Sequence, residues 1–488
     1  MHISRIMSTQ HPDNVSIPFF SEKAVMDGED EVQEAFYCFS HLGIGEQLWD
    51  AEGKEVDNFV VKKLLARHED FFRRKKLGKD IFLTLRVPNP DVEKSEGKIL
   101  LETLHSIPRN FDLAHAFLNE ELPPIFEVVL PMCSSELPLL RTKSYYHKMI
   151  QSQHEKLLDD DIPLSSWVGE LKPEDIRLTP LFETKEAILD AENAVERYVK
   201  AAQVTDLQRV WFARSDPALN YGSLAAVILA KIAMQRMARL EEKLSLPILP
   251  IIGVGSAPFR GNFKPEQALG LLKGYPSAQT FTVQSAFKYD HPVDQVREAI
   301  EQVNETKRKG PMAIDEAYAL EAFAKIEAEY QSCIRLLADR ISQVSPLIPP
   351  RRRRKLHIGL FGYSRETGGI KLPRAITFCA ALYSWGLPPE LLGLSWMKQQ
   401  DLEKVRAFYP SVDRDMADAL RFFNEENLTY FPAEIQKRVL AAAKLFPSEV
   451  DRAHGQVTSR IAKSLGQHDN QAVHDGIVEA ARIRRFLG

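Results

Sequence analysis

The stretch RLTPLFETKEAI (177–188) contains the pattern from which the fold of this chain can be predicted. A short apolar run ends in a carboxylate, Glu183, and is followed by an amphipathic helical pattern. The stretch RVWFARSDPALNYG (209–222) repeats this order, with Asp216 after its apolar run. The two acids are one strand–helix unit of roughly 30 residues apart. If successive units lie side by side in a parallel sheet, both acids emerge at the same carboxyl edge.

Glu183 and Asp216 would together form a set of hard oxygen ligands, with no His or Cys close to them in the sequence. Such ligands suit Mg²⁺ or Mn²⁺ rather than zinc. Taken singly, Asp216 could be a helix N-cap and Glu183 a solvated acid in a first helical turn. Their matched positions favour the metal site.

Eight short β-rich runs alternate with helical patterns along the chain, whereas the region 30–77 is expected to be helical, with an interruption at WDAEGKEVD (49–57). This alternation predicts a (β/α)₈ barrel, and a doubly wound open sheet is the competing arrangement. The expected strands lie in the runs 5–12, 81–90, 125–132, 179–182, 210–215, 246–261, 280–287 and 355–365.

Polar side chains at the carboxyl ends of these runs favour the barrel. In a barrel these ends form one rim, and barrel active sites lie on that rim. The polar residues at or just beyond the ends of the runs are His11, Arg86, Glu183, Asp216, Ser256, Gln284 and Arg365.

Two regions are additional to a minimal barrel. A barrel domain is expected over 1–386, with a charged helical insert over 290–345 before the eighth strand. The region 387–488 is helical and poor in strands, and is expected to pack on the outside of the barrel.

Composition narrows the class of protein. The 488 residues carry a net charge of −4, so no global field recruits nucleic acid or an anionic membrane. The four cysteines form no CxxC pair, and neither a signal-peptide core nor an apolar run of about 18–20 residues is present. A cytoplasmic enzyme is expected.

The basic run RRRRK (351–355) precedes the eighth run, so it is expected on the opposite face of the barrel as a solvated or subunit-contact patch.

The stretch GYSRETGGIKLPRAITF (362–378) places two glycines before a helix. Backbone N–H groups at a helix start, together with Arg365 and Arg374, predict a phosphate site. A tight turn with a salt-bridged arginine is the alternative. Near such a site, His11 is the candidate for proton transfer close to neutral pH.

Several segments resemble those of the phosphoenolpyruvate carboxylases. STQHPDN (8–14) is similar to that family's TAHPT segment, and TPLFETKEAI (179–188) to its PLFET segment. ARSDPALNYG (213–222) is similar to GYSDSxKDAG, and GGIKLPRAI (368–376) to GGxxxLRAI. TLRVPNP (84–90) resembles its short arginine strand. The order is also that of the family, and the length resembles the short, archaeal-type enzymes.

The resemblance implies a barrel enzyme that forms oxaloacetate and phosphate from phosphoenolpyruvate and bicarbonate. It implies carboxyphosphate and a metal-bound enolate as intermediates, anaplerotic CO₂ fixation, and assembly as a homotetramer. Carried over by motif, Glu183 and Asp216 would bind Mg²⁺ or Mn²⁺, and His11 would be the catalytic base. The remaining functional residues would be the catalytic Arg260 and the substrate-binding Arg86, Arg365 and Arg374.

The sequence also departs from the family pattern. VGSAPFRG (254–261) keeps Arg260 but lacks the His and first Arg of the family's HGRGGxxGRGG loop. Leu219 and Asn220 replace a Lys-Asp pair. Lys54, in WDAEGK (49–54), is a candidate for one of the missing cations on the bicarbonate side.

Two other functions are compatible with parts of the sequence. A metal-dependent barrel lyase or aldolase acting on a pyruvate-like substrate would use the same two acids, but neither bicarbonate nor phosphate release. A nucleic-acid-binding protein would depend on RRRRK (351–355) alone and would show salt-sensitive binding.

Overall fold

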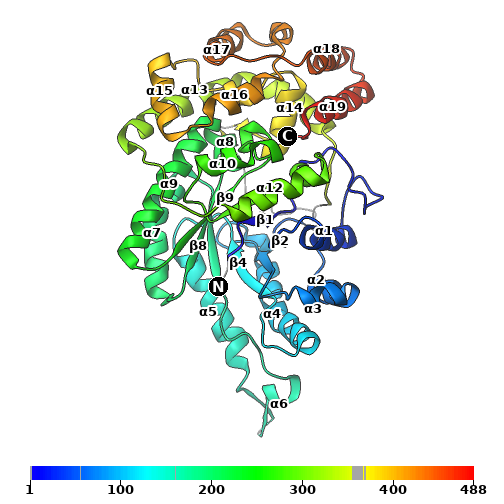
Figure 1. Ribbon diagram of the computed structural model, residues 1–488, viewed down its shortest axis with the longest axis vertical. Coiled ribbons are helices and arrows are strands. Elements are labelled where there is room, and N and C mark those ends of the chain that lie inside the picture. The colour runs from blue at the N-terminus through cyan, green and yellow to red at the C-terminus, as the bar shows by residue number, and fades with distance from the viewer. Residues whose placement is uncertain (1–2, 55, 160, 354–365, 368–369) are drawn as a thin grey trace.

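A computed structural model describes residues 3–54, 56–159, 161–353, 366–367 and 370–488 of the chain. Its centre is a closed barrel of parallel strands in the order β1-β10-β9-β8-β7-β4-β3-β2 (Figure 1). The barrel prediction is therefore confirmed, and an open sheet is excluded. The strands are β1 (Ile6–Ser8), β2 (Glu46–Asp50), β3 (Phe82–Arg86), β4 (Ile125–Leu130), β7 (Leu178–Phe182), β8 (Gln208–Ala213), β9 (Ile248–Gly253) and β10 (Thr280–Val283).

The membership of the ring differs from the predicted set of strands. The ring is closed by eight strands, and the predicted eighth run, 355–365, lies outside the described residues. The strand that the sequence analysis did not predict is β2, which lies in the region 30–77 that was expected to be helical. As a result, the expected insert follows the last barrel strand instead of preceding it. Its helices are α12 (Val293–Glu305) and α13 (Glu316–Val344).

The reason for this error lies in the interior of the barrel. Strand β2 reads EQLWD, and its alternate residues Glu46, Leu48 and Asp50 belong to three successive layers. Only the middle layer is apolar; it contains Met7, Leu48, Val129, Leu181, Trp211 and Ile251. Because the ends of β2 face charged layers, the strand has no apolar run that a sequence pattern could reveal.

The lower charged layer is centred on Arg209 of β8, which is fully buried. Its guanidinium donates to Glu46 at 2.8 and 2.9 Å and to Glu127 at 2.7 Å. Thr84 donates to Glu46 at 2.6 Å. Charges in the interior are tolerated only when they are paired and hydrogen-bonded, so this cluster links β2, β3, β4 and β8 through complementary charge.

Helices cover the outside of the barrel. α7 (Lys185–Ala201) presents an apolar stripe that includes Ile188, Ala191, Val195 and Tyr198, at the spacing of one helix face. α9 (Ser223–Leu244) is buried over most of its length because it packs against the barrel, α7 and α13. No helix within the described ranges is both long enough and apolar enough to cross a membrane.

Further helices gather beyond the carboxyl ends of the strands (Figure 1). Asn262, in the loop after β9, donates to Asp415 at 2.7 Å and to Asp418 at 2.8 Å, which ties this loop to α16. The division at 386 stays a prediction. These helices are α14 (Ala375–Ser384), α15 (Gln399–Phe408), α16 (Val412–Leu420), α17 (Ala433–Ala443), α18 (Arg452–Gly466) and α19 (Asn470–Arg484).

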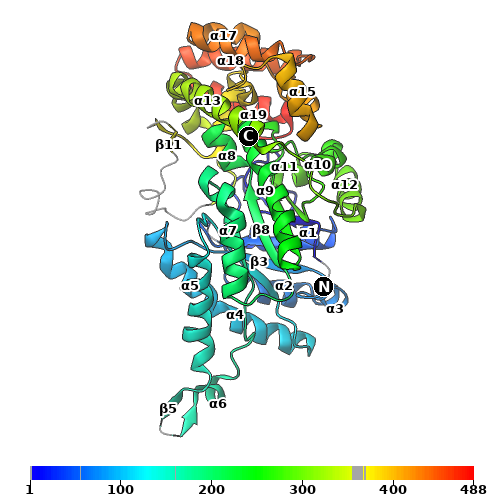
Figure 2. The ribbon, with the colours of Figure 1, turned by 90° about the vertical axis from the view of Figure 1, so that its left-hand side faces the viewer.

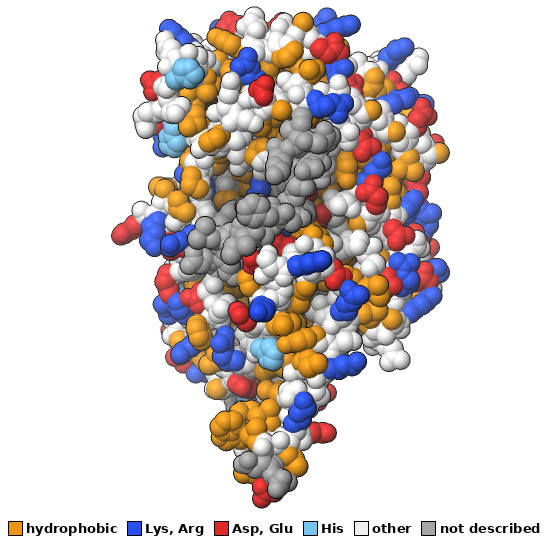
Figure 3. Space-filling model, turned by 180° about the vertical axis from the view of Figure 1, so that it is seen from behind, with side chains coloured by type: hydrophobic (Ala, Val, Ile, Leu, Met, Phe, Trp, Pro, Cys, Tyr) orange, Lys and Arg blue, Asp and Glu red, His pale blue; other side chains and the backbone are white. Residues whose placement is uncertain are grey.

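An arm projects from the opposite end of the molecule (Figure 2). It leaves the barrel along α5 (Leu137–Tyr145) and ends in β5 (Leu157–Asp159), β6 (Ile162–Pro163) and α6 (Leu164–Val168). Apolar side chains are exposed on it, and Figure 3 shows hydrophobic groups at its tip. The exposed ones include Leu157, Leu158, Ile162, Trp167 and Val168.

The Arg209 cluster generates a stability prediction. Arg209→Met should lower the free energy of unfolding by about 3–5 kcal/mol, because Glu46 and Glu127 then remain buried without their cation. Urea unfolding measures this change. Arg73→Met is the matched control, since Arg73 pairs with Glu69 on the surface and both side chains are more than half exposed. Equal effects of the two substitutions would contradict the role given to the buried cluster.

Candidate active site

A cavity of about 80 Å³ opens at the carboxyl end of the barrel. All the predicted site residues that the structure describes line it, whereas Arg365 lies outside the described residues. The charged and titratable lining residues are His11, Asp50, Glu52, Lys54, Arg86, Glu183, Asp216, Arg260 and Arg374. Sequence reasoning did not identify Asp50 and Glu52, because β2 was not recognised as a strand.

Asp50, the last residue of β2, organises one wall of the cavity. Its two carboxylate oxygens accept from Arg86 Nε at 2.7 Å and Nη2 at 2.8 Å, and Lys54 is ion-paired to the same group. Glu52 lies 2.7 Å from Arg86 Nη2. Burial alone would raise the pKa of Asp50, but the charges of Arg86 and Lys54 lower it well below its usual value. Asp50 is therefore an anion that holds two cations at the cavity.

Lys54 lies where the sequence analysis expected an additional cation. Its side chain is buried and lines the cavity together with His11. Burial lowers the pKa of Lys54, and the neighbouring Asp50 charge partly offsets this effect. Lys54 thus places the additional cation next to His11.

His11 lies three residues beyond β1, at the rim. Its pKa is lowered well below 6.5, first because of burial and then because of the charges of Lys54, Arg86 and Arg260. A histidine in this environment is neutral at pH 7, so it has a lone pair available to accept a proton. Its Nδ1 lies 3.0 Å from the hydroxyl of Thr9.

Several contacts hold Arg260 at the cavity. It donates to Gly488 O at 2.7 Å and to Ser215 Oγ at 3.1 Å, and also to Gln284. Gly261 has φ +123°, and a Cβ there would lie 2.6 Å from Val254 Cγ1, so only glycine allows this loop to fold back. The loop therefore encloses Arg260 and fixes its guanidinium at the cavity.

Glu183 and Asp216 reach the cavity from neighbouring strands. Glu183 directly follows β7, and Asp216 lies in the first turn of α8 (Ser215–Tyr221), which follows β8. No cluster of three or more His, Cys, Asp or Glu suited to a metal ion occurs among the described residues. Two carboxylates still fit Mg²⁺, which is commonly held by one or two carboxylates and completed by water and substrate oxygens.

The charges of the lining residues support the same ion. The four cationic side chains, those of Lys54, Arg86, Arg260 and Arg374, are matched by four carboxylates. These carboxylates are Asp50, Glu52, Glu183 and Asp216. The described wall is thus formally neutral, and a divalent cation between Glu183 and Asp216 would make it attractive to anions.

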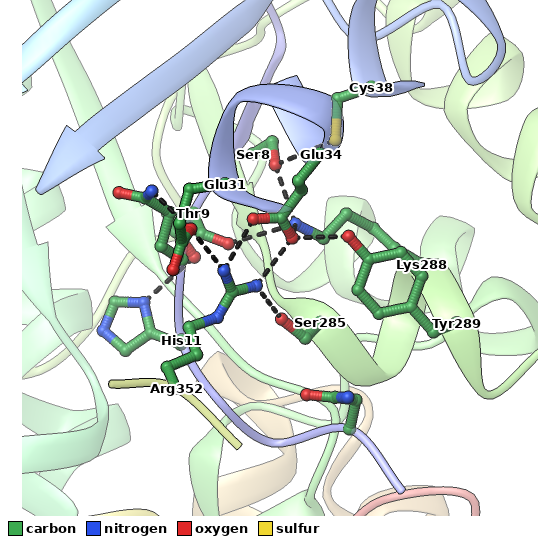
Figure 4. A network of polar contacts seen from close by, with 12 residues as sticks. Ser8, Thr9, His11, Glu31, Glu34, Cys38, Ser285, Lys288, Tyr289 and Arg352 are labelled. Atoms are coloured by element: carbon green, nitrogen blue, oxygen red, sulfur yellow. Dashed lines mark hydrogen bonds and ion pairs between the residues drawn. The ribbon is translucent and has the colours of Figure 1, made fainter. Parts of the chain in front are cut away.

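A second buried charge cluster lies behind His11 (Figure 4). Arg352 donates to Glu34 at 2.6 and 2.7 Å and is also ion-paired with Glu31; both acids lie on α1 (Gly28–Ser40). It donates to Ser285, just beyond β10, at 2.7 Å. The predicted position of RRRRK (351–355) was therefore wrong for Arg352, which is buried at the catalytic end because two buried carboxylates require a cation.

Comparisons with known proteins agree with the geometry. A family model described as phosphoenolpyruvate carboxylase matches residues 3–488. The chain is 48% identical over 489 residues to a phosphoenolpyruvate carboxylase of Methanospirillum hungatei, covering 100% of both chains. It is 52% identical over 424 residues to that of Pyrococcus furiosus, covering 86% of this chain and 89% of the relative. Likeness to solved structures is distant: a Haloferax volcanii malate synthase complex shares 10% identity at a TM-score of 0.39, covering 90% of this chain and 98% of the other.

The environment of His11 generates a prediction about pH. Because the pKa of His11 is lowered, loss of kcat/KM through protonation of His11 should occur only well below pH 6.5. In Lys54→Met one neighbouring positive charge is lost, so the imidazolium is less disfavoured and the acid limb should move to higher pH. Lys54→Arg, which keeps the charge, is the control. A limb at the same pH in Lys54→Met and in the wild type would contradict this electrostatic coupling.

Proposed function

The chain belongs to the phosphoenolpyruvate carboxylase family and is a carboxy-lyase, and we propose that its rim cavity performs the reaction through carboxyphosphate. The observation that carries this proposal is the convergence of Glu183 and Asp216, buried cations and a neutral histidine in one cavity. Assembly as a homotetramer stays a prediction from the family resemblance.

Glu183 and Asp216 would hold Mg²⁺ or Mn²⁺, which when bound supplies positive charge to stabilise the negative charge that develops on the enol oxygen. Arg86 and Arg374 would bind the phosphate and carboxylate of phosphoenolpyruvate. Arg86 is suited to this because Asp50 and Glu52 fix its guanidinium before substrate arrives. Arg365 has the same expected role and lies outside the described residues.

The first half of the reaction is a phosphoryl transfer. A bicarbonate oxygen attacks phosphorus, the enol oxygen leaves, and carboxyphosphate and the enolate of pyruvate form. Catalysis of such a step consists mainly of positioning and charge stabilisation. Arg260, held by Ser215 and Gly488, would stabilise the transferred group, and Lys54 would provide the cation for the bicarbonate side.

The second half is carboxyl transfer. His11 accepts the proton of the carboxyphosphate hydroxyl, the bond from carbon to the phosphate oxygen breaks, and CO₂ and phosphate separate. The methylene carbon of the enolate then attacks CO₂ to give oxaloacetate, and His11 returns its proton to phosphate. The lowered pKa of His11 supports this role, because the ring is neutral at the start.

The alternative functions make different predictions. A lyase or aldolase acting on a pyruvate-like substrate would release no phosphate and would need no bicarbonate. The nucleic-acid-binding hypothesis is weakened, because two of the five residues of RRRRK (351–355), Arg351 and Arg352, are buried. The decisive experiment measures phosphate release and oxaloacetate from phosphoenolpyruvate and Mg²⁺, with and without bicarbonate. Equal phosphate release in both conditions would refute carboxylation.

His11→Asn separates the two halves of the reaction. Asparagine has a similar size and polarity but cannot act as a base near pH 7. This variant should still release phosphate when bicarbonate and metal are present. Its enolate should be protonated, so pyruvate should accumulate in place of oxaloacetate. Undiminished oxaloacetate formation would show that His11 is not the base, and loss of phosphate release would place its role in the first half.

The proposed ligands can be tested by metal binding as well as by activity. Glu183→Ala and Asp216→Ala should each abolish metal-dependent turnover and weaken Mn²⁺ binding, measured by electron paramagnetic resonance of free Mn²⁺. The fold should persist, because both acids lie at the rim and not in the apolar layer. Glu192→Ala, on α7 beyond Glu183, is the control and should bind Mn²⁺ as the wild type does. Wild-type Mn²⁺ affinity in both site variants would move the metal site elsewhere.

A further inference from the structure

The contacts of His11 define which of its two ring nitrogens is basic. We propose that Thr9 fixes the tautomer of His11, so that Nδ1 carries the proton and Nε2 is the atom that accepts the proton of the reaction. The catalytic part of this inference rests on the proposed function of His11, whereas the tautomer itself can be measured independently of activity.

The tautomer follows from counting protons on the hydroxyl of Thr9. Thr9 Oγ1 lies 3.0 Å from His11 Nδ1 and donates to the carbonyl oxygen of Val283 at 3.2 Å. A carbonyl oxygen only accepts, and a hydroxyl has one proton to donate. The hydroxyl proton is therefore directed to Val283, and Oγ1 is left to accept from Nδ1–H of His11. In a neutral imidazole, a proton on Nδ1 leaves the lone pair on Nε2.

The second ring nitrogen is available for chemistry. Within the part of the chain that the structure describes, His11 Nε2 makes no hydrogen bond, while His11 lines the cavity next to Lys54 and Arg260. When Nε2 takes a proton, both nitrogens become donors, so the bond from Nδ1 to Thr9 persists through the reaction. The hydroxyl therefore supports both protonation states without moving.

Thr9 can impose this orientation because it is itself immobilised. It is fully buried, its backbone N–H donates to Val283 O at 2.9 Å, and its own carbonyl accepts from Lys288 Nζ at 3.1 Å. The carbonyl of His11 accepts from Asp13 N at 3.1 Å. Both ends of the segment that carries the ring are thus fixed by backbone contacts.

The buried charge cluster holds Lys288 in place (Figure 4). Lys288 Nζ also donates to Ser8 Oγ at 2.9 Å and to Glu34 at 2.6 Å. Glu34 in turn accepts from Tyr289 at 2.5 Å and from Arg352. Thr9 is therefore a positioning residue, and the cluster around Glu34 acts on His11 through it.

The test uses full-length protein labelled with ¹⁵N in histidine. The His11 signals are assigned as those missing from His11→Asn, and their shifts report which nitrogen is protonated. The wild type should show protonated Nδ1 and unprotonated Nε2 at pH 7.5. Thr9→Val keeps the shape of the side chain but removes the acceptor, so its His11 should shift toward the other tautomer. Thr9→Ser keeps a hydroxyl and should resemble the wild type.

Kinetics provide the second measurement. Thr9→Val should lower kcat for oxaloacetate by about tenfold, the effect of losing roughly one hydrogen bond. The KM for phosphoenolpyruvate should change little, and more pyruvate should form per phosphate released. Thr103→Val is the control, since the hydroxyl of Thr103 donates to the carbonyl of Ile99 within α4 (Gly97–Leu118), away from the cavity. Thermal unfolding of each variant shows whether it is folded.

Two outcomes would overturn the inference. One is a wild-type His11 protonated on Nε2, which needs no variant to be observed. The other is a folded Thr9→Val whose His11 tautomer is unchanged. If the tautomer changes as expected while oxaloacetate formation stays normal, the positioning by Thr9 stands and the proposed role of His11 as the base fails.

Discussion

The carboxylate of Asp50 is the group on which the candidate site depends. The carboxylate binds Arg86 and Lys54, and the backbone N–H of Asp50 donates to Gln10 Oε1 at 2.8 Å. Gln10 is the residue before His11, so one residue of β2 connects two cations of the cavity to the segment after β1 that carries His11. Without the anion, the two neighbouring cations would repel each other, and Lys54 would lose the carboxylate that raises its pKa.

The same principle organises the barrel at each level. The charged groups that the described strands point into the barrel form paired sets: Arg209 with Glu46 and Glu127 below the apolar layer, and Asp50 with its cations above it. The apolar layer between them separates the structural cluster from the reactive one. Contacts within the protein hold the charged side chains Lys54 and Arg86 at the rim. Charges that are already in position can stabilise a transition state without a further cost of reorganisation.

Electrostatics also supports the proposed role of His11 as a base. Burial and three neighbouring cations disfavour the imidazolium, so His11 remains neutral until an anionic reactant arrives. In the proposed reaction, the phosphate and carboxylate charges of the reactants would offset those cations, which would favour proton transfer to His11. Thr9, which is held through Lys288 by the cluster around Glu34, would orient the ring of His11 for this proton transfer.

The barrel and most of the residues that line the cavity could be predicted from the amino-acid sequence. Glu183, Asp216 and Arg86 could be placed at the rim because each ends a recognisable strand, and carboxyl ends of parallel strands share one edge. Strand β2, the pairing of Lys54 with Asp50, and the inward position of Arg352 were decided only by the tertiary structure. The physical reason is that these charged groups are buried by partners distant in the chain: Arg352 meets acids more than 300 residues away. Hydrophobic periodicity reports contact with the core, whereas it carries no information about which charge will neutralise another.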